Sequence, residues 1–437
     1  MLFGCGQTKL SQEPAISQDS EEKTDNTEKP EEKPEQTPVV SEVKPLKSFS
    51  PVITEEIESI HLSETEIAYN KGANHFALGL IPALYEDASF VASPLSLQVA
   101  LSMAAAGASG ETLQEMQALL GFPQAGVENM NLYTKILLEQ LLAIDLSVQL
   151  QMADALIVNK DFPLQEKYQL DMGSYYYAPV QNMDFTQAEK VIKVVNDWCY
   201  ENTHGLIPYL LDEKEFNLTA AYLLNVLYFK ADWTTQFSSY QVFKNGVFHS
   251  TRGDINVDYL CTQTYLDYSD FGSYRMALLP LGTKSLFNIA ILLPKDNNGL
   301  KALLNELNQM SWLELLSQTE RREVLFRLPK FEISSSYELK SILEEQGMTR
   351  AFTANAQFDN MFDYGVTGYI YDVIQKSRIV LDEGGIEAAA VTDVEMGATD
   401  TGEDIPTPTE FYADHPFVYV ITEKSTGTIL FVGAFQG

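Results

Sequence analysis

Hydrophobic and polar positions alternate in several short stretches of the chain and recur every three to four residues in others. Helical spacing runs through residues 67–85, through the segment after Ser93-Pro94 and through residues 187–203, and this spacing puts apolar side chains on one helix face. Serine followed by proline is typical of the first turn of a helix. Strands are predicted for residues 152–158, 274–281, 285–293 and 324–333. The mixture predicts an α+β fold.

One almost continuous apolar run, from Ala221 to Trp233, is typical of a strand that is covered on both faces. Asn225 lies in the middle of this run. A buried amide costs roughly 1–3 kcal/mol if it is left unpaired. Asn225 therefore predicts a polar cluster inside the fold.

The stretch from Glu383 to Phe417 changes character along its length. Gly384 and Gly385 begin it, and glycine lets a chain leave a strand at an unusual angle. Apolar or small residues then alternate with a set that carries three acids, the pattern of a strand with one buried face. The apolar face consists of Ile386, Ala388, Ala390, Thr392, Val394 and Met396. After Gly397 the composition becomes that of an exposed loop.

Bulk composition narrows the classes of partner. The chain has 437 residues, 45% of them hydrophobic, enough for one large core or two smaller ones. A formal net charge of −32 argues against nucleic acid, whose phosphates would be repelled, and against attraction to anionic membranes. No segment offers the roughly 20 apolar residues of a membrane helix.

No catalytic motif is visible. The five histidines are not at metal-ligand spacing, and Cys5, Cys199 and Cys261 are too few for a disulfide framework and not spaced for zinc. A Gly-x-Ser-x-Gly elbow and a phosphate-binding glycine-rich loop are both absent from the sequence. We therefore expect no enzyme activity, no metal and no cofactor.

Residues 1–50 differ from the rest, because they are rich in Glu, Lys, Gln, Ser, Thr and Pro. Such a segment cannot bury enough surface to offset its ordering entropy, so we expect a disordered tether here and a folded domain over 51–437. Leu2-Phe3-Gly4-Cys5 resembles the end of a bacterial lipoprotein signal. That resemblance implies acylation of Cys5 and a location outside the cytoplasm, either secreted or anchored to the bacterial cell envelope. The alternative is a tail without an anchor.

Several longer motifs occur in a fixed order along the chain. They are Ser93-Pro94-x-Ser96, Asn196-x-Trp198 with Thr203-x-Gly205-x-Ile207, Leu328-Pro329-Lys330-Phe331, Glu383-x-Gly385-x-Glu387-Ala388-Ala389-Ala390-x-Thr392 and Asp414-His415-Pro416-Phe417. These motifs resemble those of the serpins, and the last two resemble the proximal hinge and the C-terminal signature of that family.

The resemblance implies one serpin domain with three β-sheets, about nine helices and an exposed reactive loop. The loop, at about residues 383–411, would insert into the central sheet as an extra strand. The implied hinge residues are Glu383, Gly385, Ile386, Glu387, Ala388, Ala389, Ala390 and Thr392. A polar cluster is implied where the sheet opens, formed by Ser93, Ser96, Asn225 and Gln375, with glutamine in place of the family's histidine.

The family's activity implies a monomeric suicide-type inhibitor that traps a serine or cysteine protease in a covalent acyl complex after loop cleavage. Counting from Glu383 places the scissile bond at Thr399–Asp400, and Met396, Glu403 and Ile405 are the alternatives. No Lys or Arg lies between Arg378 and Lys424, which favours an elastase-like or subtilisin-like target over a trypsin-like one. The alternative is a non-inhibitory serpin that acts as a binding module or a protease substrate.

Overall fold

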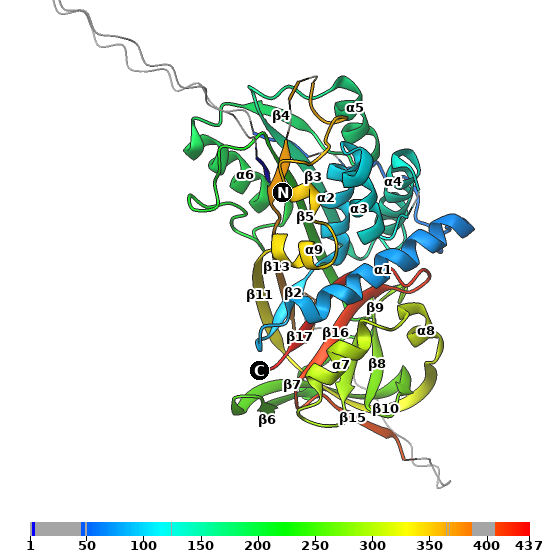
Figure 1. Ribbon diagram of the computed structural model, residues 1–437. Coiled ribbons are helices and arrows are strands. Elements are labelled where there is room, and N and C mark those ends of the chain that lie inside the picture. The colour runs from blue at the N-terminus through cyan, green and yellow to red at the C-terminus, as the bar shows by residue number, and fades with distance from the viewer. Residues whose placement is uncertain are drawn as a thin grey trace, which may run out of the picture.

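Two hydrogen-bonded sets of strands and the helices around them make up the described part of the chain (Figure 1). The structure is a computed structural model, and it describes residues 2–4, 45–48, 50–123, 125–363, 365–366, 368–386 and 407–437. Within these ranges, no helix is both long enough and apolar enough to cross a membrane.

The first set is an eight-stranded sheet, called the central sheet here. Its order is β11-β13-β14-β5-β1-β12, with β3 paired to β5 and β4 paired to β3. The strands are β1 (Leu2–Gly4), β3 (Gln149–Asn159), β4 (Val180–Met183), β5 (Ala221–Asp232), β11 (Phe331–Glu338), β12 (Tyr369–Asp372), β13 (Ile374–Leu381) and β14 (Gly385–Ile386).

The second set has nine strands in the order β15-β10-β7-β8-β9-β16-β17-β2, with β6 paired to β7. They are β2 (Phe90–Ala92), β6 (Val242–Ser250), β7 (Gly253–Asp270), β8 (Tyr274–Leu281), β9 (Phe287–Pro294), β10 (Glu320–Pro329), β15 (Thr409–Tyr412), β16 (Phe417–Glu423) and β17 (Ile429–Phe435). The long strand β7 pairs with β6 and β10 along most of its length and with β8 at its end. Two of the three expected sheets are therefore joined through β7.

Nine α-helices occur within the described ranges, in line with the expected number. They are α1 (Glu64–Leu84), α2 (Pro94–Ala106), α3 (Gly110–Leu119), α4 (Val127–Ala143), α5 (Glu166–Tyr175), α6 (Ala188–Asn202), α7 (Leu300–Leu307), α8 (Trp312–Ser317) and α9 (Lys340–Glu345). Short 3₁₀ turns span Ser239–Gln241 and Arg350–Phe352. Helix α2 begins as predicted, with the Ser93 hydroxyl capping the Ser96 N–H at 3.3 Å. Every residue of α2 is buried, and the helix packs against β5 and β17.

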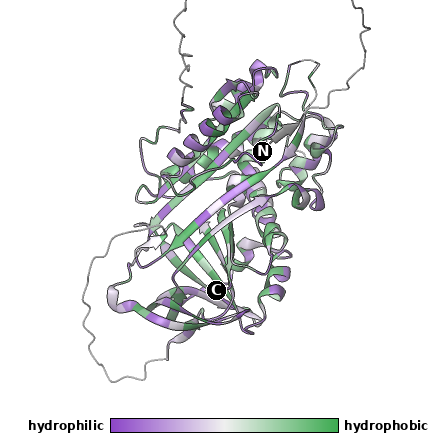
Figure 2. Ribbon diagram, turned by 90° about the vertical axis from the view of Figure 1, so that its left-hand side faces the viewer, coloured by the Kyte–Doolittle hydropathy of each residue, from purple (hydrophilic) through white to green (hydrophobic). Residues whose placement is uncertain are grey.

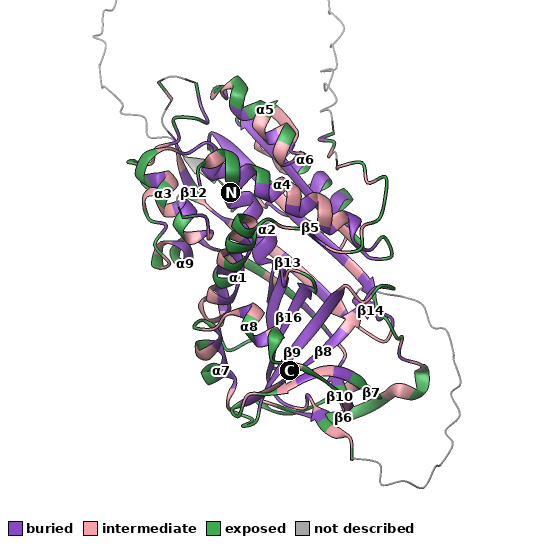
Figure 3. Cartoon of the chain, turned by 90° about the vertical axis from the view of Figure 1, so that its right-hand side faces the viewer, coloured by how far each residue is buried: buried purple, intermediate pink, exposed green. Residues whose placement is uncertain are grey.

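The strands contribute more buried apolar residues than the helices do (Figures 2 and 3). The predicted strand in the apolar run at Ala221–Trp233 is confirmed as β5, and most of its residues are apolar because its two faces enter different cores. Leu223 and Leu227 pack in the larger core, whereas Tyr222 and Leu224 pack in a smaller one beneath α6.

Part of the segment that was predicted to be a tether is packed. Leu46 is buried in the smaller core, and the Ser48 hydroxyl accepts a hydrogen bond of 2.7 Å from the Trp198 indole. Residues 2–4 pair with β5 and β12 as β1. Packed residues therefore lie before the expected domain boundary at residue 51.

Candidate functional site

The central sheet has one strand position that is occupied only at its two ends. One edge of β5 pairs with β3. At the other edge, Gly385–Ile386 of β14 pairs with Asp232 and Ala231, and at the far end Leu2 of β1 pairs with Tyr222. Between these ends β5 and β13 are not neighbours in the sheet order of the described residues.

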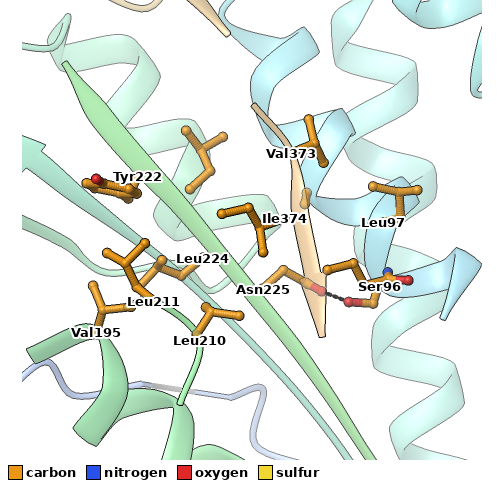
Figure 4. A pocket seen from close by; sticks show the side chains of 13 residues that line it. Ser96, Leu97, Val195, Leu210, Leu211, Tyr222, Leu224, Asn225, Val373 and Ile374 are labelled. Carbon is orange, nitrogen blue, oxygen red and sulfur yellow. Dashed lines mark hydrogen bonds between the residues drawn. The ribbon is translucent and has the colours of Figure 1, made fainter. Parts of the chain in front are cut away.

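A cavity of about 40 Å³ lies in this gap (Figure 4). Its lining includes Ser96 and Leu97 of α2, Asn225 of β5 and Ile374 of β13. On this measure one water molecule needs roughly 10–15 Å³, so the space left between the side chains holds a few waters and is far too small for a peptide strand. A further strand can enter only if β5 and β13 move apart.

The four residues of the predicted polar cluster meet at this gap. The Ser93 N–H donates to the Gln375 side-chain oxygen at 3.2 Å, and the Gln375 amide donates back to the Ser93 carbonyl at 2.8 Å. The Ser96 hydroxyl donates to the Asn225 side-chain oxygen. Asn225 is only partly buried, while the other three are buried. Gln375 thus links the start of α2 to β13, and Asn225 links the start of α2 to β5.

Sequence reasoning missed a fifth member of this cluster, Asp154 of β3. It lies opposite Asn225 in the β3–β5 pairing, and its carboxylate accepts a hydrogen bond of 2.5 Å from the Asn225 amide. Burial raises the pKa of Asp154 from 3.8 to about 7, although the Asn225 hydrogen bond opposes the rise. The available signal was a single acid inside an otherwise apolar strand segment, Met152-Ala-Asp154-Ala-Leu156.

The hinge leaves β13 through a turn that the end of β5 holds in place. The Trp233 indole N–H donates to the Asp382 carbonyl at 2.8 Å. The backbone N–H groups of Trp233 and Phe237 donate to the carbonyls of Gly384 and Glu383, at 3.1 and 3.3 Å. The chain therefore starts its path toward β5 from a fixed position.

Glu383, Gly385 and Ile386 are the predicted hinge residues that the structure describes. The Glu383 carboxylate forms an ion pair with Lys330, which lowers the pKa of Glu383. Gly385 has φ of +152°, and a side chain there would collide with the Ala231 carbonyl oxygen. Ile386 is 2% exposed and pairs with both β5 and β13. The first residue of the alternating segment is thus already inside the sheet.

The remaining predicted site residues lie outside the described residues. They are Glu387, Ala388, Ala389, Ala390 and Thr392 of the hinge, the candidate scissile residues Met396, Thr399, Asp400, Glu403 and Ile405, and the predicted lipidation site Cys5.

The described residues offer little for catalysis. They contain no group of three or more His, Cys, Asp or Glu side chains that could hold a metal ion. Burial raises the pKa of the Cys199 thiol to about 12 and also raises that of Cys261. Neither thiol therefore has the lowered pKa of a reactive nucleophile.

The central sheet has one strand position that is filled only at its two ends, and the hinge enters this position from the neighbouring strand β13. These two features define a class of protein whose central sheet can take up a further strand. Comparison with known proteins gives the family. The family model described as Serpin (serine protease inhibitor) matches residues 71–436, and the chain belongs to the serpin family. Serpins inhibit proteases and are not themselves catalytic enzymes, so the family implies a target protease as partner.

Several relatives match over most of their length. The chain is 31% identical to Iripin-3 of Ixodes ricinus over 78% of this chain and 87% of that protein. It is 33% identical to Serpin-ZXA of Oryza sativa subsp. japonica, over 82% and 94%. Among solved structures, Serpin48 of Tenebrio molitor matches with a TM-score of 0.74 and 28% identity, over 86% of this chain and 99% of that one. Together they confirm the predicted α+β serpin fold.

Proposed function

We propose that this chain is a suicide-type inhibitor that traps a serine or cysteine protease in a covalent acyl complex after its reactive loop is cut. The observation that carries the proposal is the fit between the open strand position and the residues that follow the hinge. In serpin inhibition the loop enters such a position, and a protease still esterified to the loop end is carried along and its catalytic geometry is pulled apart.

The fit follows from the register of β14. Ile386 faces Ala231 in an antiparallel pair, and residues that face each other across such a pair lie on one face of the sheet. Continuing that register would bring the next members of the apolar face opposite the larger-core face of β5, with Ala388 facing Phe229, Ala390 facing Leu227 and Thr392 facing Asn225. Small residues meet the apolar core, and the single hydroxyl of the alternating set meets the polar cluster.

The same register also supports a second candidate function, that of a non-inhibitory serpin that binds a partner or serves as a protease substrate. Residue 395 would come opposite Tyr222, where Leu2 of β1 now pairs. A retained β1 would therefore stop insertion before the loop reached Ala221, the first residue of β5. Processing before Cys5, which the lipoprotein resemblance implies, would remove β1 and free the position.

The absence of Lys and Arg between Arg378 and Lys424 supports a target with a pocket for small or uncharged residues. We place the scissile bond at Thr399–Asp400 and the target among elastase-like or subtilisin-like proteases. We further propose a monomer that acts outside a bacterial cytoplasm, secreted or anchored through an acylated Cys5.

The test is incubation with pancreatic elastase, subtilisin and trypsin, followed by denaturing gels. We expect a covalent complex with elastase or subtilisin and none with trypsin. Mass spectrometry of the released C-terminal fragment locates the cut, and a fragment that begins at Asp400 supports the predicted bond. Loop cleavage by elastase and subtilisin without any complex would instead establish the second candidate.

Two hinge variants test whether insertion causes trapping. Ala390→Glu puts a charge on the apolar face, whereas the matched control Ala389→Glu puts it on the face that already carries three acids. We expect Ala390→Glu to be cleaved without forming a complex and Ala389→Glu to keep most of the parent's complex. Equal complex formation by both variants would contradict the register. A chain that lacks residues 1–4 should form at least as much complex as the full chain.

A further inference from the structure

A second cavity lies beside the hinge. Its volume is about 420 Å³, and it lies between the chain that follows β5 and the strands β7, β8 and β9. Trp233 and Phe237 line the cavity from the chain that follows β5. Leu266, Leu278 and Asn288 line it from the strands. This volume falls within the range of roughly 300–1,000 Å³ that is usual for small-molecule sites.

The lining of this cavity combines apolar side chains with polar ones, among them Gln241, Thr262 and Thr264. Trp233, Leu266 and Leu278 are buried. Asn288 is 3% exposed and is one of the residues that line the cavity. Because a carboxamide can both donate and accept, a ligand with a polar group at this point would gain a hydrogen bond.

The rim of the cavity carries an excess of positive charge. Arg321 and Lys424 both approach the carboxylate of Asp267, at 3.9 and 4.0 Å. Neither distance is short enough for a hydrogen bond, and both cationic side chains are about half exposed. Two cations thus share one carboxylate at this rim, in a chain whose formal net charge is −32. An anion is the complementary ligand charge.

We propose that this cavity binds a small amphipathic carboxylate with an aromatic body. The carboxylate would lie between Arg321 and Lys424, and the flat body would pack against Trp233 and the exposed ring of Tyr265, which also lines the cavity. A polar group on the body would bond to the Asn288 amide. The ligand class follows from the cation pair at the mouth, the aromatic and apolar wall, and the single buried amide.

The cavity is coupled to the hinge, a step that rests on the proposed function. Trp233 and Phe237 line the cavity and also donate the hydrogen bonds that hold the carbonyls of Asp382, Gly384 and Glu383. A ligand packed against Trp233 and Phe237 restricts their movement. Occupancy of the cavity therefore slows the parting of β5 from β13 and lowers the rate of loop insertion.

Calorimetric titration of the whole chain tests the site, with indole-3-acetate as the probe and tryptamine as its cationic analogue. We expect the probe to bind in the micromolar range and tryptamine to bind at least tenfold more weakly. Arg321→Glu should weaken probe binding at least tenfold. Asp267→Asn should strengthen it several-fold, because it frees both cations. The matched control is Arg322→Glu, since Arg322 lies over the ring of Tyr268 instead.

Equal binding of the two indoles, equal loss in both arginine variants, or no heat at millimolar probe would overturn the site. A second measurement, the rate of protease complex formation with and without saturating probe, tests the coupling. We expect the probe to slow the rate several-fold in the parent and not in Arg321→Glu. An unchanged rate with confirmed binding overturns the coupling alone. If no complex forms without the probe, the proposed inhibitory function fails, while the calorimetric result on the site still stands.

Discussion

Replacing Asp154 by asparagine tests whether the central sheet contains a buried group that titrates near neutral pH. Asp154 is 3% exposed, and its burial raises its pKa from 3.8 to about 7. One pKa unit corresponds to about 1.4 kcal/mol. Keeping this carboxylate ionised in the native state at pH 8 therefore costs at most on the order of 4 kcal/mol relative to the unfolded chain.

The direction of the pH effect follows from proton binding. Between pH 3.8 and about 7 the native state holds a proton on Asp154 that the unfolded state has released. The contribution of Asp154 to the free energy of unfolding is therefore greatest below pH 3.8 and falls as the pH rises through about 7. Asparagine stays neutral at every pH and keeps an oxygen that can accept from the Asn225 amide. The stability advantage of Asp154→Asn over the parent should grow by roughly 2–3 kcal/mol between pH 5 and pH 8.

Urea unfolding at pH 5 and pH 8, followed by tryptophan fluorescence, measures this advantage. Because the parent and the variant are compared at one pH at a time, the titration of all other groups cancels. Asp197→Asn is the control, since Asp197 is exposed beside Lys193, and its effect should not change between the two pH values. If Asp154→Asn has the same effect at both pH values, Asp154 does not titrate in this range and the reasoning is refuted.

Three further predictions concern the hinge and the polar cluster. Gly385→Ala should lower the free energy of unfolding by about 1–3 kcal/mol or more, because φ is +152° and the added methyl group meets the β5 backbone. The melting temperature should fall accordingly, and an unchanged melting temperature would contradict the close approach. Glu383→Gln should lower the free energy of unfolding by about 0.5–1 kcal/mol at pH 7. Because the Lys330 ion pair lowers the pKa of Glu383 below 4.5, this loss should shrink as the pH falls below 4.5 and at 1 M salt, and a loss that persists in acid would argue against the pair. Ser96→Ala should cost about 1–3 kcal/mol in urea unfolding, and Ser96→Thr, which keeps the hydroxyl, should cost less.

Elements with strong local signals could be predicted from the sequence. The apolar run of β5 and the cap of α2 at Ser93-Pro94 depend on neighbouring residues only, and both are found in the structure. The alternation after Gly385 depends on local pattern as well. The meeting of Ser93, Ser96, Asn225 and Gln375 could be expected only from the family resemblance, because it joins segments far apart in the chain.

Other features could not be predicted because they depend on tertiary neighbours. Leu46 is one of few apolar residues in a polar segment. It is buried because it packs in the smaller core that contains Trp198, and the Trp198 indole also bonds to the nearby Ser48. Asp154 stands out in the sequence as one acid in an apolar segment, but only the pairing of β3 with β5 and the larger core show that it is buried and bonded to Asn225. The hydrogen bonds from Trp233 to the hinge cross about 150 residues of sequence, and no local pattern marks them.

The buried acid and the hinge belong to one physical problem, which is how the sheet keeps a strand position open. The chain of hydrogen bonds from Asp154 through Asn225 to Ser96 crosses from β3 through β5 to α2, so it fixes β5 against α2 at the point where the sheet must widen. Insertion of the loop would bring the Thr392 hydroxyl to Asn225, where it can replace a contact that the widening strains. An ionised Asp154 holds the Asn225 amide more strongly than a protonated one, because hydrogen bonds to charged groups are the stronger ones. The same ionisation destabilises the native sheet as a whole, so rising pH both weakens the starting state and tightens the contact that insertion has to rearrange.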